Sequence, residues 1–150
     1  ATGLPALADD SGLAVDVLGG APGVFSARWA GPLAEATGVS KDEANNQLLL
    51  AQLADVPDEH RGAGFVCAAA LVMPGEPGTT GTEVVREGHC RGVVGREPRG
   101  DNGFGYDPLL VRPDGRTTAE YSAEEKNAVS HRGEAFRALA DDIAELLGRA

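Results

Sequence analysis

The apolar run AGFVCAAALVM, residues 63–73, constrains the fold of this chain more than any other segment. Its length and apolarity favour a β-strand that is buried on both faces. The turn-forming sequence PGEPGTTG follows it, and TEVVREGHCRGVVG at 82–95 has the composition of a second strand. Strands joined by a short turn pair antiparallel, so the sequence predicts a hairpin over residues 64–95.

N-terminal capping sequences indicate helices before and after this hairpin in the chain. Ser40 to Glu43 and Ser122 to Glu125 both match a capping box. The first opens a helix that should end near Pro57, and a last helix is expected over 130–147. The last helix carries an apolar stripe at helical spacing, formed by Phe136, Leu139, Ala140, Ile143, Leu146 and Leu147. These elements predict one α/β domain over residues 1–150 with a mixed β-sheet.

Length and charge narrow the classes of partner. The chain has 150 residues, which suits one domain with a core. Its formal net charge of -10 argues against duplex binding and against an anionic membrane surface. A small polyanionic substrate stays possible, because a metal ion and a few placed cations can hold it. Cys67 and Cys90 lack metal-ligand spacing, so both are expected to be reduced thiols.

Two adjacent carboxylates, Asp9 and Asp10, follow the short apolar run LPALA at 4–8 and precede a glycine-dense stretch expected to form a loop. If a strand continues through both, only one can face a given ligand. Asp10, which is nearer the turn, is the candidate. An ionised carboxylate can hold Mg²⁺ or take a proton from an attacking water. The alternative is a turn in which aspartate caps the following amides.

A second glycine-rich segment, GFGYD at 103–107, presents an aromatic ring between two glycines. The glycines allow the backbone to approach a planar ligand, so Phe104 could offer it a flat face. Asp107 could accept a hydrogen bond from a base or a sugar. The alternative is a tight turn in which Phe104 or Tyr106 fills the core.

Three cationic or donor side chains, Lys126, His131 and Arg132, lie around the start of the last helix. This end of the helix dipole is the less favourable one for cations. Three donors at this place suit a carbonyl-bearing base or a phosphate. The alternative is an ordinary solvated helix start.

Three segments occur in one order and spacing: LPALADDSGLAVDVLGGAPGVFSARWAG, GFGYDPL and AEYSAEEKNAVSHRGEAFRAL. Together they resemble the inosine triphosphate pyrophosphatases, from about Thr2 to the C-terminus. The resemblance implies an elongated mixed β-sheet with flanking helices and a nucleotide groove between two lobes. It implies Mg²⁺-dependent hydrolysis of ITP, dITP and XTP to the monophosphate and pyrophosphate. It also implies a cytoplasmic homodimer without a nucleic-acid polymer or a membrane as partner.

The resemblance assigns roles to residues that match its motifs. Asp10 matches the catalytic carboxylate, a proton acceptor and metal ligand, with Asp9 beside it as a further ligand. Ser11 matches a substrate contact. Four further substrate-binding residues are expected to pack on the base: Phe104, Gly105, Tyr106 and Asp107. Three are expected to contact its polar edge: Lys126, His131 and Arg132.

Base selectivity would follow from hydrogen-bond matching. Hypoxanthine and xanthine carry a 6-oxo acceptor, which donors from Lys126, His131 or Arg132 could pair. Adenine places an amino donor there, and a buried donor left unpaired costs ~1–3 kcal/mol.

The resembled family has further motifs that do not precede Asp9 in this sequence: a Thr/Ser-x-Asn-x-x-Lys phosphate loop and a helix with a metal-binding Glu and a Lys. We therefore expect a partial record of a longer protein, weak activity of residues 1–150 alone, and an exposed apolar edge at Leu4 to Ala8. The alternative function is a non-catalytic nucleotide-binding or interaction protein that lost the phosphate loop.

Overall fold

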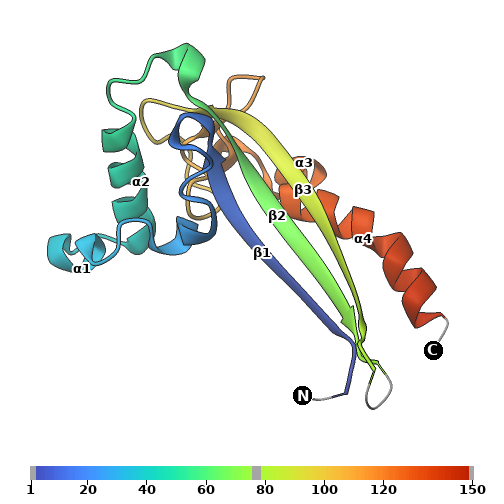
Figure 1. The fold of residues 1–150 in the computed structure, drawn as a ribbon. Coiled ribbons are helices and arrows are strands. Elements are labelled where there is room, and N and C mark those ends of the chain that lie inside the picture. Colours follow the sequence, from blue (N-terminus) through green and yellow to red (C-terminus); the bar gives the residue numbers. More distant parts are fainter. Residues whose placement is uncertain (1–2, 76–78, 149–150) are drawn as a thin grey trace.

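The computed structural model describes residues 3–75 and 79–148. One antiparallel sheet and flanking helices make up this part of the chain (Figure 1). The strands, in spatial as well as chain order, are β1 (Ala6–Val15), β2 (Gly62–Met73), β3 (Thr82–Val94) and β4 (Leu110–Val111). The helices are α1 (Leu33–Thr37), α2 (Lys41–Gln52), α3 (Ala123–Val129) and α4 (His131–Leu147).

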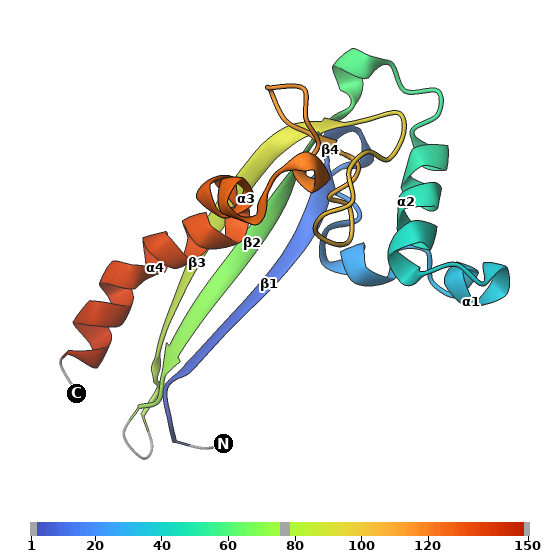
Figure 2. The same cartoon turned by 180° about the vertical axis from the view of Figure 1, so that it is seen from behind.

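The predicted hairpin is confirmed. β2 and β3 pair antiparallel from Gly62 opposite Val93 to Met73 opposite Thr82. Burial on both faces was a wrong prediction for β2, because its side chains alternate between buried and partly exposed positions. α3 and α4 lie across one face of the hairpin (Figure 2), and on the other face Val72 and Val85 stay more than 40% exposed.

The α/β class is confirmed, but the pairings in the described residues are all antiparallel rather than mixed. The connection between β1 and β2 explains this. A parallel pair needs a crossover that carries the chain to the opposite end of the sheet. Residues 16–61 return instead to the end where β1 finished, since Val15 lies opposite Ala63.

β1 is longer than the sequence predicts and runs through both aspartates to Val15. The glycine-dense stretch begins as strand because Leu13 and Val15 are fully buried while Ala14 between them faces the other side. β1 is one of the two edge strands of the described sheet. The expected apolar edge is confirmed, with Leu4 69% and Leu7 50% exposed.

α2 ends at Gln52, four or five residues before the predicted end near Pro57. The buried Arg61 side chain explains the early end. Its guanidinium donates to the Leu53 carbonyl at 2.5 Å and to the carbonyls of Val94 and Gly95 at 2.8 Å. These bonds tie the end of α2 to the end of β3, so the chain turns before the proline. α1 was not predicted.

α3 and α4 begin at the predicted caps. Ser122 accepts from the Glu125 amide, and Ser130 accepts from the Gly133 amide at 3.0 Å. The apolar stripe is confirmed for Phe136, Leu139, Ile143 and Leu146, which pack on the sheet cluster around Cys67.

Two members of the predicted stripe point elsewhere. Ala140 and Leu147 are exposed, whereas Ala135 is buried against the sheet. Gly88 of β3 sets this rotation: a Cβ there would collide with the backbone of His131 and Ala135, so only glycine lets α4 approach so closely.

The core has two parts that meet in the middle of β2. One lies under α2 and the 96–109 loop and includes Leu49, Leu109 and Phe65. The other lies between the sheet and α4 and includes Cys67 and Leu139. Cys67 and Cys90 are both buried free thiols, as expected. Among the described residues, no helix combines the length and apolarity needed to cross a membrane.

Candidate functional site

Asp107 is the centre of a polar cluster where the two parts of the core meet. Its side chain is buried, and its carboxylate accepts three hydrogen bonds. The donors are the Lys126 ammonium at 2.5 Å, the Phe104 amide at 2.8 Å and the Thr118 hydroxyl at 2.8 Å. A buried carboxylate with this many donors is held rigidly, and it fixes Lys126 of α3 beside the 103–107 loop.

The side chains of Phe104 and Tyr106 point in different directions from this loop. The Phe104 ring is 80% exposed, and the Lys126 ammonium lies 5.2 Å from its centroid. Tyr106 is buried, donates to the Ser26 carbonyl at 2.9 Å, and has its pKa raised by burial. Of the two rings that the sequence left open, Phe104 is free to stack on a planar ligand and Tyr106 fills the core.

Gly103 is required for the close approach between the loop and Asp107. Its φ is +82°, in the left-handed region, and a Cβ there would overlap the Asp107 carboxylate. Any side chain at this position would push Asp107 away from Lys126.

His131, the first residue of α4, stacks on Phe65 of β2 with ring centroids 5.1 Å apart. Burial lowers the pKa of His131; Asp107 opposes this shift, while the charges of Lys126 and Arg132 add to it. The imidazole is therefore neutral near pH 7 and offers one donor and one acceptor.

Arg132 projects from the same turn of α4 to Asp9 of β1, with the guanidinium 2.9 Å from the carboxylate. The Arg132 side chain is 64% exposed and the Asp9 side chain 21%. The two residues are 123 positions apart in the sequence. Phe104, Asp107, Lys126, His131, Arg132 and Asp9 thus form one group, which we call the Asp107 cluster.

Asp10 and Ser11 lie next to this cluster on alternate faces of β1. Ser11 faces α4, since its side chain hydrogen-bonds Cys67. Asp10 is exposed on the opposite face, and its carboxylate accepts the Ser11 amide at 3.0 Å. Both alternatives considered for Asp10 are compatible with this geometry: it caps an adjacent amide, and it presents a solvated carboxylate at the sheet edge.

The thiol of Cys67 lies between these groups, 4.0 Å from the Asp9 carboxylate. Burial raises its pKa, with a smaller contribution from the Asp9 charge. A thiol kept protonated is a poor nucleophile, so Cys67 serves packing.

The carboxylates give limited support to the predicted Mg²⁺ site. Across residues 3–75 and 79–148, no three His, Cys, Asp or Glu side chains converge closely enough to hold a metal ion. Asp9 is paired with Arg132, whereas Asp10 is exposed. A single carboxylate fits Mg²⁺ when substrate phosphates complete the coordination.

The depressed pKa of His131 makes folding stability depend on pH. The unfolded chain binds a proton at its ordinary value of 6.5, while the folded chain holds the ring neutral to lower pH. Stability is therefore complete above 6.5 and decreases as pH falls toward the folded pKa. Thermal unfolding midpoints across this range should fall less steeply for His131→Gln than for the wild type. Above this range, where the His131 ring is neutral in both the folded and the unfolded chain, the difference between the two midpoints should be constant.

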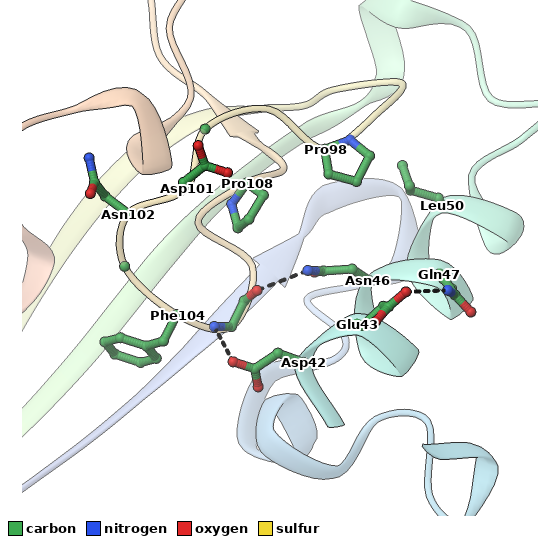
Figure 3. Close-up of a pocket in the computed structure, with 13 residues that line it drawn as sticks. Asp42, Glu43, Asn46, Gln47, Leu50, Pro98, Asp101, Asn102, Phe104 and Pro108 are labelled. Atoms are coloured by element: carbon green, nitrogen blue, oxygen red, sulfur yellow. Dashed lines mark hydrogen bonds between the residues drawn. The ribbon is translucent and has the colours of Figure 1, made fainter. Parts of the chain in front are cut away.

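Sequence reasoning missed the support that α2 gives to the 103–107 loop. Asp42 accepts the Gly105 amide at 2.7 Å, and Asn46 donates to the Gly105 carbonyl at 3.0 Å (Figure 3). Asn46 is a buried amide one helical turn after Asp42. A polar residue inside the apolar face of a helix was the available signal.

Comparison with known proteins places this arrangement in a family. A model of the Ham1 family matches residues 1–142. The chain is 61% identical to a dITP/XTP pyrophosphatase of Streptomyces coelicolor over 150 residues, which cover 99% of this chain and 69% of the relative. It is 62% identical to the protein of that name from Frankia alni over 148 residues, or 97% and 70% of the two chains.

Solved structures agree with the fold. A nucleoside-triphosphatase / dITP/XTP pyrophosphatase from Mycobacterium abscessus is 56% identical with a TM-score of 0.75, covering 92% of this chain and 65% of that one. The Ham1 protein of Staphylococcus aureus is 37% identical with a TM-score of 0.82, covering 99% and 70%. These matches confirm the resemblance drawn from the three motifs. The chain belongs to the Ham1 family, and the match includes every residue of the Asp107 cluster.

Proposed function

We propose that this protein hydrolyses dITP, ITP and XTP to the nucleoside monophosphate and pyrophosphate, and so removes aberrant purines from the nucleotide pool. The Asp107 cluster carries the proposal: it sets the exposed Phe104 ring beside the Lys126 ammonium and brings the donors of His131 and Arg132 into the same group. The names of the Streptomyces coelicolor and Frankia alni relatives support dITP and XTP as substrates.

The cluster can bind a 6-oxopurine by stacking and by donation. Phe104 offers its exposed face to the base, and Lys126 stays fixed beside it by Asp107. Arg132 and neutral His131 supply further donors on the same side. The 6-oxo group accepts from these donors, whereas the 6-amino group of adenine would leave a donor unpaired.

For the reaction, Asp10 takes the proton of a water that attacks the α-phosphorus. The bond from that phosphorus to the bridging oxygen breaks, and pyrophosphate leaves. Asp10 is exposed on β1, an edge strand of the described sheet, on the face opposite the Asp107 cluster, so the triphosphate of a nucleotide bound at the cluster would cross this edge to reach it. Mg²⁺, held by Asp10 together with triphosphate oxygens, would neutralise charge on the phosphates. Asp9 would act by aligning Arg132, because the two side chains are paired.

The test is pyrophosphate release from dITP in the presence of Mg²⁺, with dATP as control substrate. It should be run on residues 1–150 and on the complete product of the gene. Faster pyrophosphate release from dITP than from dATP supports the proposal. If neither protein releases pyrophosphate but IMP still binds, the non-catalytic alternative is correct.

Arg132→Ala should narrow the preference for dITP over dATP by about ten-fold, because one donor to the 6-oxo group is lost. The ratio of kcat/KM values for the two substrates measures this. Arg137→Ala removes an exposed arginine of the same helix and is the control. An unchanged ratio in Arg132→Ala would exclude Arg132 from base recognition.

We also propose a cytoplasmic homodimer. The buried free thiols are compatible with a reducing compartment. The exposed apolar side chains on the face of the β2–β3 hairpin opposite α4, such as Val72 and Val85, support self-association. Sedimentation equilibrium of the gene product tests the assembly.

A further inference from the structure

α2 holds the peptide groups on both sides of one residue in the 103–107 loop. The Gly105 amide donates to Asp42, and the Gly105 carbonyl accepts from Asn46. The two α2 residues are four positions apart, so they lie on one face of the helix. Figure 3 shows both bonds converging on the loop beside Phe104.

Side-chain packing leaves this part of the loop weakly supported. The Phe104 ring is largely exposed, and residues of α2 and of the 98–105 segment together line a cavity of about 440 Å³. Gly105 itself has φ +60° and no side chain to pack. The backbone conformation at Phe104 therefore depends on hydrogen bonds. The Phe104 amide donates to Asp107, the Gly105 amide donates to Asp42, and the Gly105 carbonyl accepts from Asn46.

The side chain of Asn46 lowers the stability of the folded chain at its position. It is only 7% exposed, and its Oδ1 is buried without a hydrogen-bond partner among the described residues. An unpaired buried acceptor destabilises the folded chain, so an apolar side chain of similar size would suit this helix at least as well. The amide nevertheless supplies the bond to Gly105, which indicates a role beyond stability.

We propose that Asp42 and Asn46 are positioning residues that set the Phe104 ring for stacking on the purine base. They act through Gly105 and do not touch the substrate. This inference rests on the proposed function, because it assumes that Phe104 contacts the base. A loop held in its binding conformation loses less conformational freedom when the nucleotide binds.

The effect of these residues should therefore be on binding rather than on the chemical step. In the complete gene product, Asn46→Leu should raise KM for dITP and Kd for IMP by about ten-fold, with kcat unchanged. The thermal unfolding midpoint should stay the same or rise. Asp42→Ala should raise KM similarly, and Asp42→Asn, which keeps an acceptor oxygen, should restore it. Gln47→Ala, whose side chain bonds Glu43 instead of the loop, is the control.

A double-mutant cycle separates positioning from general stability. In a Phe104→Ala background, Asn46→Leu should raise KM no further, since the ring it orients is absent. The inference is overturned if Asn46→Leu keeps the wild-type KM, or if it raises KM equally with and without the Phe104 ring. In either case, turnover of dITP by the wild type would still uphold the proposed function. If the wild type neither binds IMP nor hydrolyses dITP, the proposed function fails and the inference fails with it.

Discussion

Asp10→Asn is expected to lower pyrophosphate release from dITP by about 10²- to 10⁴-fold in the complete gene product, the range for loss of a general base. The amide cannot take a proton from water and is a weaker ligand for a cation. IMP binding should persist, because the base is bound by the Asp107 cluster and Asp10 lies on the other face of β1. Steady-state kinetics with dITP and calorimetric titration with IMP measure the two quantities.

The control is Asp141→Asn, the same substitution at an exposed carboxylate of α4. It should keep wild-type turnover. If Asp10→Asn loses IMP binding and unfolds at lower temperature, then Asp10 has the structural role of the turn interpretation. Because Asp10 is exposed and accepts only a neighbouring amide in the described contacts, we expect its removal to leave the unfolding temperature unchanged.

Asp107→Ala is expected to destabilise the folded chain by about 3 kcal/mol, because it removes a buried carboxylate that accepts three hydrogen bonds while its partner Lys126 stays 23% exposed and can be rehydrated. The substitution leaves the Lys126 ammonium, the Phe104 amide and the Thr118 hydroxyl without their acceptor. Chemical denaturation gives the free energy of unfolding. The same variant should lose IMP affinity, since both Phe104 and Lys126 are released.

Lys126→Met is the informative comparison for Asp107→Ala. It removes the cation but leaves the carboxylate with two donors, Phe104 and Thr118. The buried carboxylate then keeps its charge without the cation, which is also costly, so the loss of stability should be comparable and the loss of IMP affinity similar. A loss below about 1 kcal/mol in Asp107→Ala would mean that the carboxylate does not organise the cluster.

Local patterns in the sequence determined the hairpin and the starts of α2, α3 and α4. These features depend on residues within a few positions of one another. A Ser-x-x-Glu start is set by the geometry of one helical turn, and an apolar run with a turn sequence is set by strand pairing. The three motifs likewise identified the family, because their residues and spacing can be compared directly.

Other features depend on contacts between distant segments. β1 continues into the start of the glycine-dense stretch, as far as Val15, because the core accepts Leu13 and Val15. The α4 stripe turns toward Ala135 because Gly88 of β3 allows the helix backbone to approach. Pattern and propensity carry no information on these contacts, since each is decided by what packs against the segment.

For the candidate site, too, some features follow from the sequence and others only from the structure. The residue types of the Asp107 cluster can be named from the motifs, but their partners cannot. Asp9 pairs with Arg132 across 123 positions, and Asp42 and Asn46 reach Gly105 across 63 and 59. The sequence alone therefore determined which side chains carry the proposed chemistry. Only the tertiary structure decided that Phe104 faces out, that Tyr106 fills the core and that α2 holds the loop between them, because hydrogen bonding and burial depend on distance in space.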